Sequence, residues 1–289
     1  MRLATIETAN GPRACVEVGD RLVDIHAVDP SLPTSVKGLL AAGPAALTAA
    51  RAVVESSAAS AASLPSDQPR RLPPIPDAGK IVCLGLNYRD HAIESGLEPP
   101  PEPVLFSKYP TTLIGHGAPI VLPAVSRSVD YEAELVIVVG KGGRHISQAD
   151  AMKHVAGYTV GHDVSARDWQ LEKPGKQWMA GKTFDTFAPT GPALVTADEV
   201  PDPGDLRIAL RLNGETMQDS RTNQLIFAVD FVIAYLSRIF TLEPGDLIFT
   251  GTPPGVGMAR KPPVWLKPGD VVEVEIERLG VLRNPVVAE

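Results

Sequence analysis

The chain has 289 residues, of which 44% are hydrophobic and 21% charged, and its mean hydropathy is +0.04. These values are typical of a globular protein with a sizeable core and exclude a disordered or fibrous chain. The net charge is −7 and no basic block occurs, so we expect a small-molecule ligand rather than a nucleic acid. The 28 prolines and 25 glycines favour strands, turns and loops over long helices.

The cellular location is inferred from cysteines and apolar segments. The two cysteines, Cys15 and Cys83, do not have the spacing of a metal site or of a disulfide framework. No apolar stretch approaches the roughly 20 residues that a membrane span needs, and the N-terminus lacks the apolar region of a signal peptide. We therefore expect a cytoplasmic protein without a membrane partner.

The N-terminal part of the chain predicts a small domain. Residues 2–25 contain short apolar runs separated by Asn-Gly and Gly-Asp turn signals, which predict three strands. The alanine-rich stretch 39–63 predicts one or two surface helices interrupted by a proline. Residues 64–76 contain five prolines and are expected to continue neither kind of element. We predict a domain boundary here, between a β-rich domain at 1–70 and a catalytic domain at 71–289.

Most of the chain after residue 80 alternates apolar and polar residues with a period of two, which predicts a mainly β domain of the α+β class. Two segments are expected to be helical. Residues 147–154 begin with Ser147 and Asp150 at the spacing of a capping box. Residues 228–240 carry apolar side chains on one helical face.

Residues 129–140 predict a strand on which Asp130, Glu132 and Glu134 share one face. Neighbouring like charges are unfavourable unless water or a cation compensates them. Two interpretations stay open for this segment, a solvated strand end and a cation site. Asp163, which follows a second strand-like run, would complete an all-oxygen ligand set. Such a set suits Mg²⁺ or Mn²⁺ rather than Zn²⁺, because neither histidine nor cysteine contributes.

Residues 84–96 predict a turn followed by a short helix capped by Asn87. His91 and Glu94 would lie one helical turn apart on the same face. A carboxylate beside an imidazole raises its basicity and fixes its tautomer, as a general base requires. The alternative is a helix-surface pair that contributes about 0.2–0.5 kcal/mol.

Three further features are candidate parts of a binding site. Arg167 and Asp168 form either a surface ion pair or part of a binding site. Lys182 is a potential anion ligand, although not in a P-loop, because Lys176 stands where that motif needs glycine. The turn at residues 250–257 offers two threonines and exposed backbone amides, which form either an anion nest or a purely structural turn.

Five segments occur in a characteristic order: NYRDHAIE, DYEAE, GHDVSARDWQ, GKTFDTFAPTGPALVT and TGTPPGVG. Together they resemble the fumarylacetoacetate hydrolase superfamily over residues 80–289, and most closely its subgroup of fumarylacetoacetate hydrolase domain-containing protein 2. The resemblance implies the mixed β-roll catalytic domain of that family, with a small N-terminal β-rich domain. It also implies a homodimer and a bound divalent cation, Mg²⁺ or alternatively Mn²⁺.

The resemblance further implies metal ligands, catalytic residues and substrate contacts. The metal ligands would be Glu132, Glu134 and Asp163, the catalytic residues His91, Glu94 and Lys182, and the substrate contacts Arg167, Gln170 and Thr252. One position departs from the family pattern, because Leu86 stands where the acylpyruvases of the family have an arginine. A cationic contact with a substrate carboxylate is therefore absent at this position, which argues against acylpyruvase and oxaloacetate decarboxylase activities.

The main functional expectation is hydrolysis of a carbon–carbon bond in a small 2-oxo or 1,3-dioxo acid, such as an acylpyruvate or a fumarylacetoacetate-like compound. The reaction would proceed through an enolate that the cation stabilises. One alternative is an oxaloacetate keto–enol tautomerase, or a decarboxylase, at the same site. Another, of a different class, is a non-catalytic metal-binding protein. The sequence does not separate hydrolase from tautomerase, because both need the same enolate.

Overall fold

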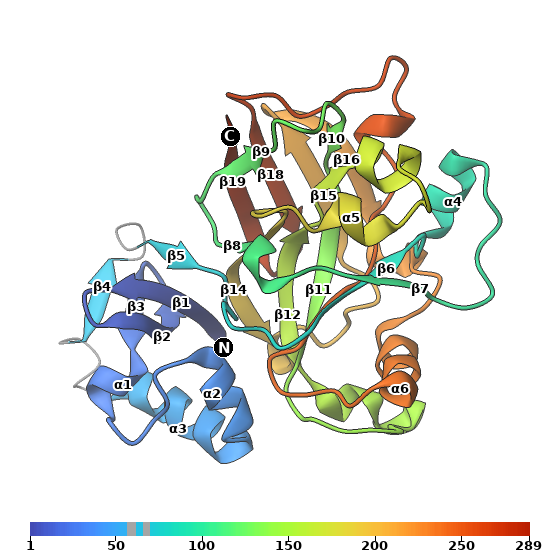
Figure 1. Ribbon diagram of the computed structural model, residues 1–289. Helices are drawn as coiled ribbons and strands as arrows, with labels where there is room; N and C mark the ends of the chain where they lie inside the picture. Colours follow the sequence, from blue (N-terminus) through green and yellow to red (C-terminus); the bar gives the residue numbers. More distant parts are fainter. Residues whose placement is uncertain (57–61, 66–69) are drawn as a thin grey trace.

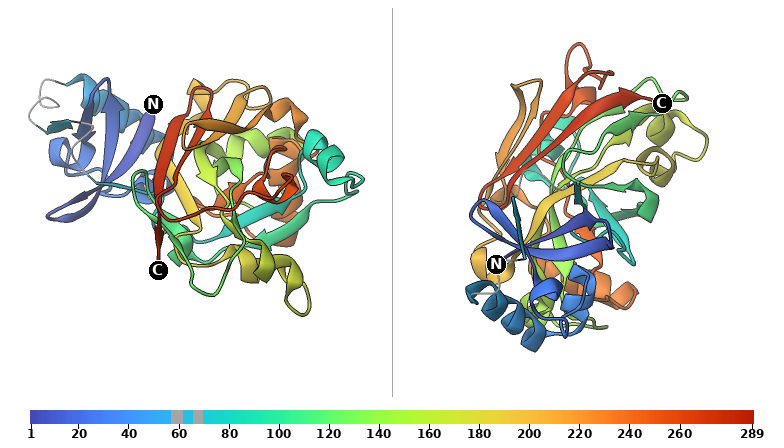
Figure 2. Two further views of the ribbon diagram at one scale, coloured as in Figure 1. Left: turned by 90° about the horizontal axis from the view of Figure 1, so that it is seen from above. Right: turned by 90° about the vertical axis from the view of Figure 1, so that its left-hand side faces the viewer.

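The computed structural model describes residues 1–56, 62–65 and 70–289 (Figure 1). Strands form the centre of the molecule and helices cover its outside, which confirms the predicted mixed α+β class. Seen from above, the N-terminal elements lie at one end and helix α4 (Arg89–Ser95) lies at the other (Figure 2, left).

The N-terminal meander is confirmed as β1 (Arg2–Thr8), β2 (Gly11–Val18) and β3 (Arg21–Asp24). The alanine-rich stretch provides α3 (Pro44–Glu55), in which the proline occupies the first turn, where a missing N–H is tolerated. Residues 57–61 of that stretch lie outside the described residues. The remaining N-terminal elements are α1 (Ile25–Val28), α2 (Val36–Ala41), β4 (Ser63–Pro65) and β5 (Arg71–Leu72).

The expectation that the proline-rich segment continues no strand is wrong for β4 and β5. Strand β4 pairs with β3, and β5 pairs with β1. Strand β1 in turn pairs with a strand of the second half of the chain, so the N-terminal strands extend the main sheet. The division into domains at 1–70 and 71–289 stays a prediction.

The main sheet has the order β4-β3-β2-β1-β14-β12-β11-β17-β6-β7, with β5 beside β1 and β8 beside β14. Its members from the second half of the chain are β6 (Ile81–Gly85), β7 (Val104–Ser107), β8 (Leu113–Ile114), β11 (Ala133–Val139), β12 (Val155–His162), β14 (Ala188–Thr196) and β17 (Leu247–Phe249).

A second sheet has the order β16-β15-β18-β19-β9. Its strands are β9 (Ile120–Leu122), β15 (Arg207–Leu212), β16 (Glu215–Arg221), β18 (Val271–Ile276) and β19 (Gly280–Ala288). The short strands β10 (Val129–Asp130) and β13 (Ser165–Ala166) pair with each other.

Strand β11 is buried on both faces, because each face packs against a different hydrophobic cluster. Leu135 and Ile137 face the cluster that includes the second sheet and helix α6 (Val229–Ile239). Val136 and Val138 face a cluster that includes side chains of the N-terminal helices. A strand covered on both faces keeps its position, so the residues next to its ends are rigidly placed.

The remaining helical elements are short. Residues 148–154 form the 3₁₀ helix η3, and the Ser147 hydroxyl accepts a hydrogen bond from the amide of Asp150, as the capping pattern predicts. The other elements are η2 (Pro110–Thr112), η4 (Asp168–Glu172), α5 (Trp178–Lys182), η5 (Ala197–Glu199), η6 (Thr222–Gln224) and η7 (Gly257–Ala259). None of the helices in the described part of the chain is long and apolar enough to cross a membrane.

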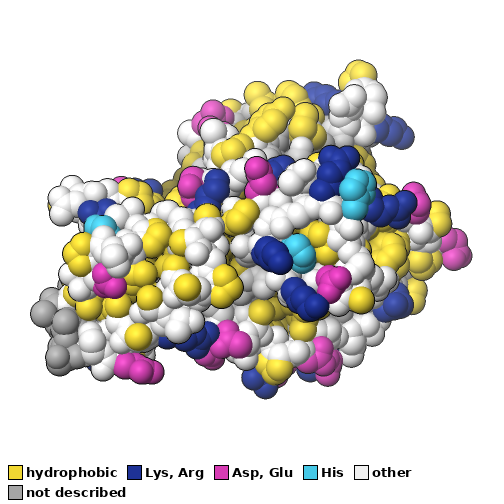
Figure 3. Space-filling view, turned by 90° about the horizontal axis from the view of Figure 1, so that it is seen from below, with side chains coloured by type: hydrophobic (Ala, Val, Ile, Leu, Met, Phe, Trp, Pro, Cys, Tyr) yellow, Lys and Arg dark blue, Asp and Glu magenta, His cyan; other side chains and the backbone are white. Residues whose placement is uncertain are grey.

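The surface seen from below carries basic, acidic and hydrophobic side chains in alternation (Figure 3). A nucleic-acid surface needs an extended run of positive charge. The face in this view therefore gives no support to a nucleic-acid partner, in line with the negative net charge.

Candidate active site

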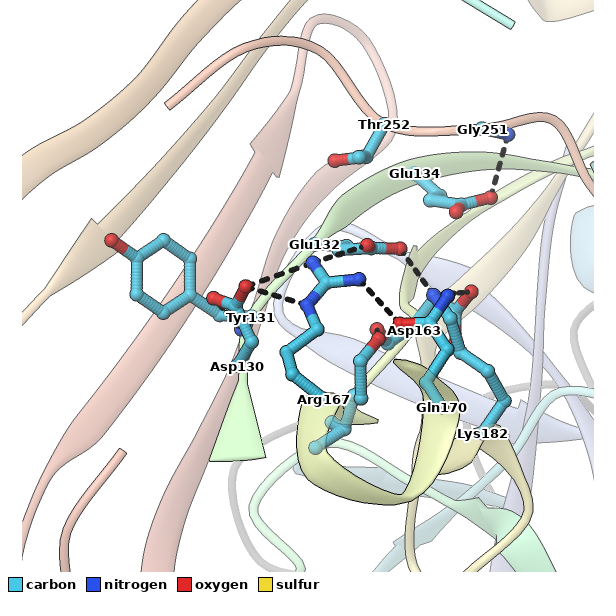
Figure 4. A network of polar contacts seen from close by, with 12 residues as sticks. Asp130, Tyr131, Glu132, Glu134, Asp163, Arg167, Gln170, Lys182, Gly251 and Thr252 are labelled. Atoms are coloured by element: carbon cyan, nitrogen blue, oxygen red, sulfur yellow. Dashed lines mark hydrogen bonds and ion pairs between the residues drawn. The ribbon is translucent and has the colours of Figure 1, made fainter. Parts of the chain in front are cut away.

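Three carboxylates gather where β11 begins and β12 ends (Figure 4). Glu132 and Glu134 come from the start of β11, and Asp163 follows β12, whose last residue, His162, pairs with Ala133. One oxygen of each carboxylate lies within 4.8 Å of the others. All three side chains are buried, so the interpretation as a solvated strand end is wrong. We call these three residues the acidic cluster.

Two lysines compensate part of this negative charge. Lys182, at the end of α5, places Nζ 2.7 Å from Glu132 and 2.8 Å from Asp163. Lys108 places Nζ 2.6 Å from Oδ1 of Asp163 and also donates to the backbone carbonyls of Val164, Lys182 and Phe187. Lys182 therefore binds protein carboxylates rather than a free anion, and Lys108 is a site residue that the sequence reasoning missed. A single lysine after a strand gave no signal.

The carboxylates differ in their electrostatic environments. Burial raises the pKa of Glu132, but Lys182 and Arg167 outweigh it and lower the pKa to about 2. Burial also raises the pKa of Glu134, and the nearby charges of Asp163 and Glu132 raise it further, to well above its usual value. Glu134 accepts a hydrogen bond from the amide of Gly251 at 2.7 Å but forms no ion pair within the described residues.

The charge balance of this region fits a divalent cation. Four buried carboxylates face three buried cationic side chains within the described residues; the carboxylates are Asp130, Glu132, Glu134 and Asp163, and the cations are Lys108, Arg167 and Lys182. The excess negative charge lies at Glu134. Oxygen ligands at this spacing are the kind that Mg²⁺ and Mn²⁺ prefer, so the acidic cluster could hold such an ion.

Arg167 is buried between two carboxylates. Its guanidinium donates to Asp130 at 2.8 Å, to Glu132 at 2.6 Å and to the side-chain oxygen of Gln170 at 2.9 Å. Asp168 points elsewhere and accepts from the Ser126 hydroxyl. The interpretation of Arg167 and Asp168 as a surface ion pair is therefore wrong.

Asp130 is predicted to share a strand face with Glu132 and Glu134, but it does not belong to the acidic cluster. Its oxygens accept hydrogen bonds from the amides of Gly257 at 2.6 Å and Met258 at 3.1 Å, as well as from Arg167. The face is divided because β10 ends at Asp130 and β11 begins at Ala133. Asp130 thus links Arg167 to the end of the 250–257 turn, at Gly257, and to the next residue, Met258.

Helix α4 carries the expected histidine–glutamate pair. His91 Nδ1 lies 3.0 Å from Glu94 Oε2, and Glu94 Oε1 accepts a hydrogen bond from the amide of Gly255 at 2.9 Å. Burial raises the pKa of Glu94, but the hydrogen bonds from His91 and Gly255 outweigh it and lower the pKa. The pair therefore also attaches α4 to the 250–257 turn.

Asn87 does not cap α4, contrary to the prediction. The cap position is Tyr88, and Asn87 is fully buried. Its side-chain amide donates to the carbonyl of Thr250 at 2.8 Å, and its oxygen accepts from the amide of Phe227 at 2.8 Å. Asn87 thus connects the base of α4 to two distant segments, which its position in the sequence did not reveal.

The backbone amides of the 250–257 turn bind anionic groups of the protein itself. The amides of Gly251, Gly255 and Gly257 donate to Glu134, Glu94 and Asp130. Within the turn, the Thr252 hydroxyl accepts a hydrogen bond from Gln218. The turn therefore acts as the predicted anion nest, but for side-chain carboxylates.

A cavity of about 510 Å³ lies beside these residues. Seven of the nine residues implied by the resemblance line it, and the other two belong to the acidic cluster together with Glu132. His91, Glu94, Glu132, Arg167, Gln170, Lys182 and Thr252 line the cavity, and Glu134 and Asp163 lie within 4.8 Å of Glu132 at the oxygen atoms. This volume is in the range of about 300–1,000 Å³ typical of small-molecule sites.

Comparison with known proteins identifies the family. The protein-family model described as fumarylacetoacetate (FAA) hydrolase C-terminal matches residues 80–287 of the sequence. The chain belongs to the fumarylacetoacetate hydrolase family. It is 50% identical to a human protein named oxaloacetate tautomerase FAHD2A, mitochondrial, over 96% of this chain and 88% of that protein.

Solved structures agree with the family. The chain resembles fumarylacetoacetate hydrolase from Exiguobacterium antarcticum with a TM-score of 0.85 and 35% identity, over 100% of both chains. It also resembles maleylpyruvate hydrolase from Sphingobium sp. SYK-6, in complex with manganese(II) and pyruvate, with a TM-score of 0.81 and 32% identity over 100% of this chain and 99% of that one. The chain is thus an enzyme of the fumarylacetoacetate hydrolase superfamily, and the predicted β-roll is confirmed.

The comparisons correct two expectations. The cytoplasmic location is wrong, because the human protein and other relatives at 48% identity are named mitochondrial. The cysteine count indicated a reducing compartment but does not distinguish one such compartment from another. The names of these relatives also favour the tautomerase alternative over carbon–carbon hydrolysis.

The environment of Glu134 predicts how the protein responds to Mn²⁺. A cation bound by the acidic cluster stabilises the folded state, by about 2.7 kcal/mol at 100 times the dissociation constant. Glu134→Gln should abolish the Mn²⁺-dependent rise in melting temperature. Without metal its melting temperature should equal or exceed that of the wild type, because glutamine avoids the cost of a buried carboxyl group whose charged form is repelled by Asp163 and Glu132. Thermal unfolding with chelator and with Mn²⁺ measures both effects.

The matched control is Glu55→Gln, at an exposed position on α3. It should respond to Mn²⁺ like the wild type. A full Mn²⁺ response in Glu134→Gln would remove Glu134 from the ligand set.

The contacts of Asp130 predict a large loss of stability for Asp130→Asn. The substitution leaves Arg167 without a charged partner on one side and turns an amide donor toward backbone donors, so the free energy of unfolding should fall by about 3–5 kcal/mol. Asp168→Asn, which changes a nearby half-buried carboxylate, should lower the free energy of unfolding by only about 1 kcal/mol. Urea unfolding of both variants gives the comparison, and equal losses would contradict the special position of Asp130.

Proposed function

We propose that this enzyme interconverts the enol and keto forms of oxaloacetate and requires a divalent cation for this activity. The observation that carries the proposal is that Glu132 of the acidic cluster and the His91–Glu94 pair line the same cavity. The 50% identity to a protein named oxaloacetate tautomerase supports the choice of substrate.

The acidic cluster of Glu132, Glu134 and Asp163 would hold the cation, with Mg²⁺ and Mn²⁺ as the candidates. A cation bound there would polarise the substrate carbonyl and stabilise the negative charge of an enolate. Lys108 and Lys182 form ion pairs with Asp163, and Lys182 and Arg167 form ion pairs with Glu132, so both carboxylates are compensated where they are buried.

His91 is the proposed general base that transfers the proton. Because Glu94 engages Nδ1, that nitrogen keeps its proton and Nε2 is the nitrogen that accepts one. In the enol-to-keto direction, Nε2 takes the hydroxyl proton and the C2–O bond becomes a carbonyl as the C2–C3 double bond becomes single. The protonated Nε2 then delivers that proton to C3, which returns His91 to its neutral form. Glu94 lowers the energy of the imidazolium that forms in between, so the pair acts as a unit.

The substrate is oriented by groups around the pair. Arg167, Gln170 and Thr252 have polar side chains at the cavity wall, and Arg167 and Gln170 are held together by a hydrogen bond of 2.9 Å. These residues would contact the carboxylate groups of the acid. We also propose that the enzyme is a homodimer, as the family resemblance implies.

The direct test follows the decay of enol oxaloacetate by its ultraviolet absorbance, with the rate of the same cation in buffer subtracted. Wild-type enzyme with Mg²⁺ or Mn²⁺ should accelerate the conversion, and chelation should remove the acceleration. His91→Ala should lower kcat by about 10²–10⁴-fold, as expected for loss of a general base, while keeping the Mn²⁺-dependent rise in melting temperature.

His154→Ala provides the matched control. This half-buried histidine binds the carbonyl of Lys141 and does not line the cavity, so its variant should retain full activity. Release of pyruvate from an acylpyruvate, without acceleration of the oxaloacetate conversion, would replace the tautomerase by a hydrolase. Absence of either reaction in the metal-loaded enzyme would contradict both.

A further inference from the structure

One side of the catalytic cavity is apolar. Six of its lining residues form what we call the apolar wall: Leu86, Leu97, Val104, Phe106, Leu171 and Trp178. Val104 and Phe106 lie on strand β7, Leu86 directly follows β6, and Trp178 is the first residue of α5. The wall is therefore built from elements that lie side by side near α4 (Figure 1).

The wall is tightly packed. The Phe106 and Trp178 rings meet edge to face at 5.9 Å, and a Cβ atom added at Gly85 would lie 2.1 Å from the Trp178 ring. The Lys182 ammonium lies 5.1 Å from the centre of the Phe106 ring. The aromatic part of the wall therefore directly adjoins the charged residues at the base of the cavity.

Oxaloacetate has no large apolar group that could pack against this wall. It is a four-carbon acid with a carboxylate at each end, and a carboxylate gains nothing from an apolar surface that has displaced its water. The cations that line the cavity, Arg167 and Lys182, are both engaged by carboxylates of the protein itself.

We propose that the same site also interconverts the enol and keto forms of 2-oxo acids that carry an aromatic group on C3, with that group packed against the apolar wall. This inference rests on the proposed function and extends its substrate class. An aromatic ring buries a large apolar surface and pairs well with other rings edge to face. The cavity volume of about 510 Å³ provides room for it.

The reaction needs no additional reactant. The enol hydroxyl proton passes to Nε2 of His91, the C2–O bond becomes a carbonyl, and the protonated Nε2 returns that proton to C3. The aromatic ring and the carbon skeleton remain unchanged. The reverse direction removes a proton from C3, which the neighbouring carbonyl and ring both acidify.

The test uses phenylpyruvate and oxaloacetate as parallel probes with the metal-loaded full-length enzyme. The decay of each enol is followed by ultraviolet absorbance, after subtraction of the rate in buffer with the same cation. We expect kcat/KM for phenylpyruvate to be within about tenfold of that for oxaloacetate.

Two variants place a negative charge on the wall. Leu97→Asp and Val104→Asp change side chains that are 55% and 37% exposed, so the fold should tolerate them. Each should lower kcat/KM for phenylpyruvate at least tenfold more than for oxaloacetate. The matched control is Ile93→Asp, on helix α4 four residues before Leu97 and 80% exposed, which does not line the cavity and should leave the ratio unchanged.

The outcomes separate this inference from the proposed function. If oxaloacetate is converted but phenylpyruvate is not, the inference is wrong and the proposed function stands. If the wall variants lower both activities equally, the wall does not bind the aromatic group and the inference is again wrong. If phenylpyruvate alone is converted, the inference stands and the oxaloacetate proposal fails; if neither is converted, both fail.

Discussion

Burial of several carboxylates at one point is the constraint on which this site depends. The start of β11 brings Glu132 and Glu134 inside the protein, and the end of β12 adds Asp163 beside them. Charges of one sign at such distances in a dry environment oppose folding unless they are compensated. Lys108 and Lys182 compensate part of the charge, and Glu134 remains without an ion pair within the described residues, which is the basis of the proposed cation site.

The 250–257 turn connects this constraint to the rest of the site. Its amides bind Glu134 in the acidic cluster, Glu94 on α4 and Asp130 beside Arg167. One short segment thus helps to position Glu134 of the acidic cluster, the His91–Glu94 pair and, through Asp130, Arg167. Because backbone amides are held by the turn itself, they supply positive potential that needs no flexible side chain.

Local patterns predicted the strands, helix α6 and the candidate ligands, because alternation and residue type carry that information. They failed where a side chain's partner is distant in sequence. Asn87 has a suitable position for a cap but binds Thr250 and Phe227, more than 130 residues away. Lys108 and Asp130 meet their partners through the pairing of strands, which spacing along the chain does not show. The family resemblance supplied roles that the residues alone left open.

The central claim is that the acidic cluster holds a divalent cation beside the catalytic pair. A crystal of the protein grown with Mn²⁺ tests this most directly, through the anomalous difference density of manganese. The account predicts one strong peak per chain within bonding distance of carboxylate oxygens of Glu132, Glu134 and Asp163. Absence of a peak there at saturating Mn²⁺, or a peak at other residues alone, would contradict it.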